Sequence, residues 1–203
     1  MCITGATICH MKIKERLLEW QILVLGSSVG LIASFIQTIE RIHYAQNPNV
    51  ELACNVSAIF SCSNVFDAWQ SAVFGFSNSI MCLAFFGILL GIGLTGMTGS
   101  TLNKQLRLSM HFFTIFFLGF GAWYQQQSAY AKGYICLYCL ACYSGVIAMN
   151  WAWLRLNAGD LPIGEGMRKK LRHAIQKNYD TYFWVLWAAA IIGMMFARFY
   201  RPI

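Results

Sequence analysis

Charged residues are scarce in this sequence, and their scarcity excludes an ordinary soluble domain. Asp, Glu, Lys and Arg make up 11% of the 203 residues, whereas 58% of the chain is hydrophobic. A soluble domain usually carries about a quarter charged residues. None of the four charged types occurs in five long stretches, which are residues 20–39, 68–103, 108–131, 133–154 and 181–197.

These uncharged stretches have the length of membrane spans. A bilayer core about 30 Å thick needs about 20 helical residues, and a charge at its centre costs roughly 3 kcal/mol. Residues 68–103 are too many for one helix, so we divide them near residues 75–78 and take 79–99 as the span. The sequence therefore predicts an all-α integral membrane protein with five transmembrane helices.

Two further absences narrow the interpretation. No small-x-small cleavage site precedes Glu40, so we expect the first span to be an uncleaved helix rather than a signal peptide. The net charge of +7 comes without a basic stripe that has interleaved aromatic residues, and we expect no nucleic-acid partner.

The basic residues instead indicate the topology. If the N-terminus is cytoplasmic, eleven Lys and Arg residues lie on the inner side and four on the outer side, which is the usual positive-inside bias. Residues 1–16 then form a cytoplasmic tail, 158–180 a basic cytoplasmic loop, and 181–203 the fifth helix with a short outer tail. We expect the inner basic residues to contact anionic lipid headgroups.

This topology gathers four of the eight cysteines at the outer face. Cys54 and Cys62 fall in the outer loop, and Cys136 and Cys139 fall at the start of the fourth span. Disulfides form and persist in oxidising compartments. A structural zinc site would need closer ligand pairs than an eight-residue separation provides. An iron–sulfur site lacks a fourth cysteine followed by proline. The pattern therefore favours redox chemistry over metal binding.

Helix geometry adds detail to this site. Cys136 and Cys139 lie three apart, so they share a helix face, and Tyr143 returns to that face about 6 Å deeper. A helix N-terminus stabilises a thiolate, and Cys136 occupies such a position.

Apolar residues at helical spacing from Val65 to Phe74 predict a short amphipathic helix over the bundle. For the run Gln125–Gln127 at the end of the third span we favour interfacial solvation, with lining of the pocket by one of the three as the alternative.

Three stretches carry a resemblance to a known family. LACNVSAIFSCSNVF, FGFSNSI and YICLYCLACY together resemble the vitamin K epoxide reductase family of membrane thiol oxidoreductases, over about residues 17–154. The resemblance implies a four-helix transmembrane bundle as the catalytic domain, placed at residues 17–157, with a cap helix in the outer loop. The fifth helix is an addition to that core.

The resemblance also implies roles for individual residues. Cys54 and Cys62 match the family's shuttle pair, and Cys136 and Cys139 match its active-site pair. Three further residues match positions that contact the quinone or cover it from the cap helix, namely Asn78, Tyr143 and Phe66. Electrons would pass from Cys54–Cys62 to Cys136–Cys139 and on to ubiquinone or menaquinone. No metal is expected.

The implied function is disulfide formation. A separate DsbA-like or thioredoxin-like periplasmic protein would be reoxidised at the outer face of a bacterial inner membrane. The terminal Arg-Pro-Ile is not an ER-retention signal. Two alternatives stay open: a vitamin K epoxide or quinone reductase of the ER, and a non-enzymatic five-helix scaffold with structural or metal-binding cysteines.

Overall fold

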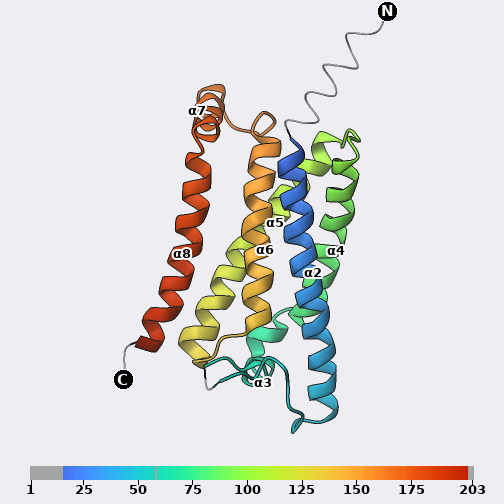
Figure 1. Cartoon of the computed structure of the whole chain (residues 1–203), viewed down its shortest axis with the longest axis vertical. Helices are drawn as coiled ribbons and strands as arrows, with labels where there is room; N and C mark the ends of the chain where they lie inside the picture. The colour runs from blue at the N-terminus through green and yellow to red at the C-terminus, as the bar shows by residue number, and fades with distance from the viewer. Residues whose placement is uncertain (1–15, 58, 201–203) are drawn as a thin grey trace, which may run out of the picture.

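The computed structural model describes residues 16–57 and 59–200, which form helices joined by loops (Figure 1). Five of these helices are long and apolar enough to cross a membrane. They are α2 (Leu17–Gln46), α4 (Asn78–Met97), α5 (Lys104–Gln126), α6 (Leu137–Asn157) and α8 (Tyr179–Tyr200). The fold class predicted from the sequence is confirmed. Almost all of the expected N-terminal tail and the last three residues lie outside the described residues.

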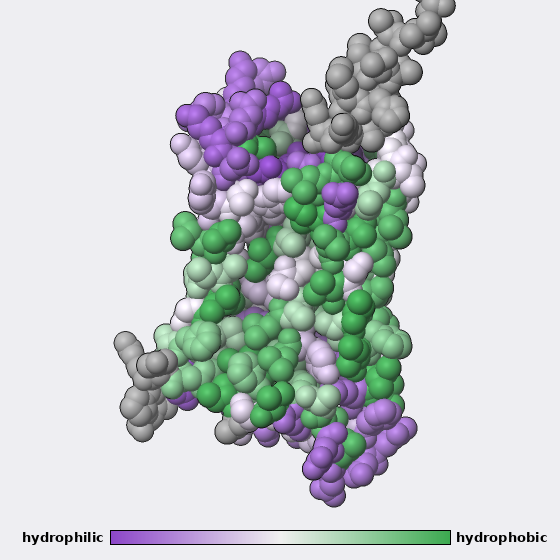
Figure 2. All heavy atoms as spheres, viewed as in Figure 1, coloured by the Kyte–Doolittle hydropathy of each residue, from purple (hydrophilic) through white to green (hydrophobic). Residues whose placement is uncertain are grey.

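The surface has the pattern of a multi-pass membrane protein. Figure 2 shows a broad apolar belt between two hydrophilic ends. The short helix α7 (Glu165–Gln176) lies at one of these ends and has no buried residue. The outer loop with the short helix α3 (Cys62–Phe66) lies at the opposite end. The basic loop and the cysteine-rich loop therefore occupy opposite sides of the apolar belt.

Helix α2 is longer than the hydropathy of the sequence indicates. The uncharged stretch stops at Ile39, yet the helix continues to Gln46. Charged residues end a membrane span because lipid cannot solvate them, but the helix and its backbone hydrogen bonds can continue beyond the lipid. Glu40 and Arg41 consequently lie on a rigid helix and not in the outer loop.

Helices α2 and α6 pack in direct backbone contact. A Cβ atom on Gly145 would lie 2.5 Å from the carbonyl oxygen of Gly26, and one on Gly26 would lie 3.0 Å from the oxygen of Gly145. On the α4 side, a Cβ atom on Gly30 would lie 2.3 Å from the Phe86 ring. Small residues of this kind allow membrane helices to approach closely. The contact fixes α2 against the helix that carries Cys139.

The turn between α5 and α6 sets the start of α6. Helix α5 ends in a π-helical segment, η2 (Gln127–Lys132), and Gly133 follows with a φ of 76°, a conformation that glycine adopts without steric cost. The Ser128 hydroxyl donates a hydrogen bond to the backbone carbonyl oxygen of Tyr134 at 2.5 Å. The Tyr134 N–H donates one to the backbone carbonyl oxygen of Ser128 at 3.2 Å. The turn thereby fixes the position of Ile135 and Cys136, the two residues that precede α6.

Helix α8 stands at the edge of the bundle, where polar contacts attach its first residues and an apolar cluster around Met195 packs against Ala129 and Ile135. Asp180 accepts hydrogen bonds from Arg155 at 2.7 and 2.9 Å, and the Trp151 indole donates to the Thr181 hydroxyl at 3.0 Å. Apolar helices gain little by leaving lipid for one another, so packing and interhelical hydrogen bonds hold them together. The polar contacts fix the start of α8 at the C-terminal end of α6.

Candidate functional site

The outer loop is organised by a disulfide and by one asparagine. Cys54 and Cys62 form a disulfide with their Cα atoms 5.8 Å apart. Between them, the Asn55 side-chain oxygen accepts hydrogen bonds from the N–H groups of Cys62 at 2.8 Å and Ser63 at 3.3 Å. Asn55 therefore caps α3 from seven residues away, a role that the sequence analysis did not recognise.

The cap differs from the single helix expected between Val65 and Phe74. Helix α3 stops at Phe66, and a 3₁₀ segment, η1 (Trp69–Ala72), follows after a break. The break lies at Ala68, whose backbone is extended with φ −77° and ψ 135°. Spacing of apolar residues identified the segment as helical but could not reveal this interruption.

A backbone bridge brings the two cysteine pairs together. Phe60 and Ile135 form an isolated parallel β-bridge, with hydrogen bonds from Ile135 N–H to the Ile59 oxygen at 2.8 Å and from Ser61 N–H to the Ile135 oxygen at 3.2 Å. From this bridge the chain reaches Cys136 directly on one side, and on the other side it reaches Cys62 through Ser61. The Cys62 and Cys136 sulfurs accordingly lie 3.6 Å apart, and both residues are fully buried.

Cys136 and Cys139 are free thiols in this state. Cys136 is the N-cap residue of α6. A hydrogen bond shared with Cys139, followed by burial, raises the pKa of the Cys136 thiol well above its ordinary value. The helix N-terminus acts on this pKa in the opposite direction, and a thiolate at Cys136 stays a prediction.

The outer end of α2 supplies polar groups to the cysteines. Gln37 donates from Nε2 to the Cys139 sulfur at 3.4 Å and to the Cys136 sulfur at 3.6 Å. Arg41 donates to the Ser71 oxygen at 3.3 Å and lies over the Phe66 ring. The Tyr44 hydroxyl donates to Asp67 at 2.8 Å. These residues and Glu40 recur at intervals of three and four, which places them on one helix face.

No motif or resemblance in the sequence places these α2 residues in the site. From the sequence, Arg41 is one of the four basic residues expected on the outer side, and Glu40 is only the limit of the search for a cleavage site. The available signal was their helical periodicity just beyond a membrane span. Recognising it required the knowledge that α2 continues past residue 39.

A cavity opens beside Cys139 within the four-helix bundle. Residues from α2, α4, α5 and α6 line it, including Cys139, Asn78 and Tyr143. Asn78 donates to the Gln70 oxygen at 2.7 Å, while its own side-chain oxygen is buried without a hydrogen-bond partner. Among the described residues that line the cavity, Arg41 carries the only formal charge. The cavity is thus mostly apolar, with a few polar groups near a thiol.

Gln125 corrects the expectation for the run of three glutamines. Its side chain is 1% exposed and lines the cavity, and its Oε1 atom is buried without a partner. Gln126 is exposed and Gln127 is half-buried. Interfacial solvation therefore does not account for Gln125. Its position on α5 instead adds a second buried polar oxygen to the cavity.

Tyr143 is fixed from outside the four-helix bundle. The Trp187 indole on α8 donates a hydrogen bond to the Tyr143 hydroxyl at 2.9 Å. Because the hydroxyl oxygen accepts this bond, the hydroxyl proton of Tyr143 can be donated elsewhere. The fifth helix therefore contacts a cavity residue directly, a connection that no motif in the sequence indicates.

Phe66 lies apart from the cavity. It packs with both disulfide cysteines, Cys136 and Tyr44 in the cluster beneath the outer loop. The structure therefore places Cys139, Asn78 and Tyr143 around the cavity. It places Phe66 against the disulfide instead. A direct contact between Phe66 and a quinone stays a prediction.

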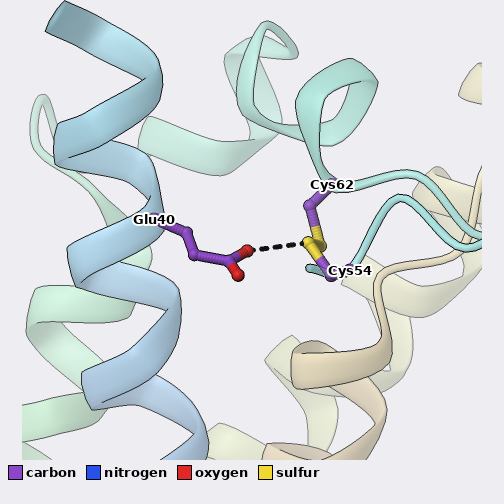
Figure 3. Close-up of side chains that lie close together, drawn as sticks. All are labelled: Glu40, Cys54 and Cys62. Carbon is purple, nitrogen blue, oxygen red and sulfur yellow. Dashed lines mark hydrogen bonds between the residues drawn. A yellow bond between two sulfur atoms is a disulfide. The ribbon is translucent and has the colours of Figure 1, made fainter. Parts of the chain in front are cut away.

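A cluster of possible metal ligands coincides with the disulfide. The ligand atoms of Glu40, Cys54 and Cys62 lie within 4.8 Å of one another (Figure 3). Metal ions bind thiolates, and neither sulfur is a thiolate while the disulfide is intact. In this oxidised state the arrangement suits sulfur exchange rather than metal binding.

Comparison with known proteins agrees with this geometry. A family model of the vitamin K epoxide reductase family matches residues 21–154 of the chain. The match begins in α2 and ends in α6, so it contains both cysteine pairs and the residues that line the cavity. No curated protein matched the chain.

Proposed function

This chain belongs to the vitamin K epoxide reductase family, and we propose that it is a membrane thiol:quinone oxidoreductase that reoxidises a periplasmic thioredoxin-like protein. The observation that carries the proposal is the 3.6 Å separation of the Cys62 and Cys136 sulfurs. It links the disulfide of the outer loop to the thiol pair beside the cavity. Thiol–disulfide exchange requires such an approach, because each step is attack by one sulfur on another.

The exchange proceeds through two dithiol pairs. A thiolate of the partner opens the Cys54–Cys62 disulfide and forms a mixed disulfide with Cys54, and Cys62 leaves with the electron pair. With Cys136 and Cys139 oxidised, Cys62 attacks Cys136 and Cys139 leaves as a thiolate. The second thiol of the partner then attacks the partner's sulfur in the mixed disulfide and releases Cys54. Cys54 in turn attacks Cys62, closes the loop disulfide and releases Cys136. Two electrons thus move from the partner's dithiol to Cys136 and Cys139.

The cavity residues fit a quinone headgroup. A quinone supplies an acceptor for two electrons and two protons. Tyr143 offers a hydroxyl proton, because its oxygen already accepts from Trp187. Asn78 and Gln125 offer buried side-chain oxygens without partners, which can accept hydrogen bonds from the hydroxyl groups of the reduced quinone. Gln37 stabilises negative charge on the Cys139 sulfur, and Arg41 adds a positive charge at the same wall. Pockets of this kind are largely apolar with a few orienting polar groups.

The proposed setting is a bacterial inner membrane with the cysteines facing the periplasm. The distribution of basic residues supports a cytoplasmic inner end. The helix α7 carries five basic residues, Arg168, Lys169, Lys170, Arg172 and His173, and would lie against anionic headgroups. The partner is a separate protein of the DsbA-like or thioredoxin-like class, and the acceptor is ubiquinone or menaquinone.

Turnover by the purified protein tests this function. We expect one quinone to be reduced for every two thiols lost from a reduced thioredoxin-like protein, followed by quinone absorbance and thiol titration. Replacing the quinone with vitamin K epoxide in the same assay tests the reductase alternative. Stoichiometric zinc in the protein together with no thiol–quinone turnover would instead support a metal-binding scaffold.

Loss of the polar cavity groups should weaken quinone use. We expect Asn78→Ala and Tyr143→Phe each to raise the KM for quinone about tenfold, since a lost hydrogen bond to a buried polar group costs roughly 1–3 kcal/mol. Formation of both disulfides, measured by thiol alkylation, should be unchanged. An unaltered KM in both variants would remove these residues from the quinone site.

The fifth helix should act on the same site through Tyr143. Trp187→Phe removes the indole N–H that holds the Tyr143 hydroxyl, and we expect a severalfold higher KM for quinone with thiol exchange unchanged. Trp184→Phe, one turn away on α8, is the matched control and should leave the KM at the wild-type value. Equal effects of the two changes would show that only general packing of α8 matters.

A further inference from the structure

Glu40 directs its carboxylate at the disulfide of the outer loop. Its Oε2 atom lies 3.0 Å from the Cys54 sulfur, and Figure 3 shows the side chain reaching from α2 to the disulfide. In the disulfide state Cys54 has no proton, so this contact is not a hydrogen bond. Once Cys54 is a thiol, the same geometry suits an S–H group that donates to Glu40.

The other carboxylate oxygen is held by two donors. Oε1 accepts a hydrogen bond from the Tyr138 hydroxyl at 3.0 Å and one from the Ala53 N–H at 3.2 Å. These bonds come from α6 and from the residue before Cys54, so they orient Glu40 with respect to both parts of the site. Oε2 is left facing the sulfur.

No cation of the described part of the chain forms an ion pair with this carboxylate. Among residues 16–57 and 59–200 the two ion pairs are Arg107–Asp160 and Arg155–Asp180. The neighbouring Arg41 turns instead to Ser71 and to the Phe66 ring. A carboxylate that is free of a cationic partner and lies about 3 Å from a reacting atom has the position required of a general base.

We propose that Glu40 is a catalytic residue that accepts the proton of the Cys54 thiol when Cys54 attacks Cys62, and that returns it when Cys54 leaves. This inference rests on the function proposed above and adds a proton path to it. In the closing step the Cys54 sulfur forms a bond to the Cys62 sulfur, the bond from Cys62 to its partner sulfur breaks, and that sulfur leaves with the electron pair. The Cys54 proton moves to Glu40 Oε2 and later to solvent or to the leaving thiolate.

The role of Glu40 is specific to Cys54. Cys62 has the Cys136 sulfur at 3.6 Å and receives backbone support from Asn55 through its N–H. When Cys62 attacks a sulfur attached to Cys54, Glu40 has no thiol proton to accept. The two directions of closure should therefore depend differently on the carboxylate, and this difference separates catalysis from a merely structural effect.

The test uses the full chain with Cys136→Ala and Cys139→Ala, so that only the outer-loop pair exchanges. The reduced protein is converted at acid pH to mixed disulfides with glutathione, on Cys54 in some molecules and on Cys62 in others. After a jump to higher pH, peptide mass spectrometry follows the decay of each adduct in the same sample. The assay needs neither quinone nor a protein partner, so its outcome does not depend on turnover.

We expect Glu40→Gln to slow decay of the Cys62 adduct about 100-fold near neutral pH, the usual effect of a lost general base. The Cys54 adduct should decay at the wild-type rate. Decay of the Cys62 adduct should also rise about tenfold per pH unit in Glu40→Gln, because it then depends on the Cys54 thiolate. The ionisable and charged groups around this contact are Tyr138 from α6, Arg41 and Tyr44 from α2, and Asp67.

Two further variants complete the test. Glu40→Asp keeps the carboxylate and should recover part of the rate. Glu51→Gln removes an exposed carboxylate of the same loop and should behave as wild type. Unchanged decay of the Cys62 adduct in Glu40→Gln would overturn the proposal. Equal slowing of both adducts would also overturn it, because that result means a disturbed loop and not a lost base.

Discussion

Replacing either Cys136 or Cys139 with alanine should abolish quinone reduction, whether the donor is a thioredoxin-like protein or a small dithiol. Cys139 lines the cavity and Cys136 lies 3.6 Å from Cys62, so the pair joins the loop to the cavity. If one of the two sulfurs is missing, the Cys136–Cys139 disulfide cannot form, and no electrons reach the acceptor. The measurement is steady-state quinone reduction with each donor.

Replacing Cys54 or Cys62 should have a different result. The protein donor should lose most of its rate, because it engages the outer-loop disulfide, whereas a small dithiol should reach Cys136 and retain a larger share. Cys2→Ala and Cys9→Ala, which the predicted topology places in the cytoplasm, serve as controls with full activity. Full turnover in the Cys136→Ala or Cys139→Ala protein would refute the relay.

Gly145→Ala should destabilise the bundle by about 1–3 kcal/mol or more, the usual cost of overpacking. The added Cβ would lie 2.5 Å from the Gly26 carbonyl oxygen. Because that atom belongs to the backbone of α2, relief requires the two helices to separate. Their separation would also move Gln37 and Glu40 away from the cysteines, so thiol exchange should slow as well.

Gly119→Ala is the matched control for this change. A Cβ atom on Gly119 would meet nothing within 4 Å, and the residue also lies within a transmembrane helix. Both substitutions gain the same helix propensity, about 1 kcal/mol. Denaturant unfolding in detergent, followed by circular dichroism, should show Gly145→Ala less stable than wild type and Gly119→Ala at least as stable. Equal stability of the two variants would contradict close α2–α6 packing.

The spans were predictable because their cause is local in the sequence. An uncharged stretch of about 20 residues is favourable in lipid whatever surrounds it. The ends of the helices were less predictable. Helix α2 continues past Ile39 to Gln46, since leaving the lipid does not end a helix. The cap segment was expected as one helix and is divided at Ala68, because apolar spacing carries no information on a single extended residue.

The site was predictable in part and for a different reason. The cysteine pairs, Asn78 and Tyr143 were identified from motifs, and the structure brings the Cys62 and Cys136 sulfurs together and places Asn78 and Tyr143 around one cavity. The roles of these residues stay predictions until turnover is measured. Glu40 and Trp187 carry no motif. The contact of Glu40 with Cys54 exists because the loop folds back on α2, and the contact of Trp187 with Tyr143 exists because α8 packs against α6.

The sequence by itself determined that this chain is a helical membrane protein with a redox-suited set of cysteines. Charge scarcity and thiol chemistry are properties of residues, and they act without reference to the fold. Only the tertiary structure decided which sulfurs meet, through the bridge between Phe60 and Ile135. It also decided which carboxylate faces Cys54 and which indole holds Tyr143. Such contacts join separate segments of the chain, and their distances are set by helix packing and by the fold of the loop over the bundle.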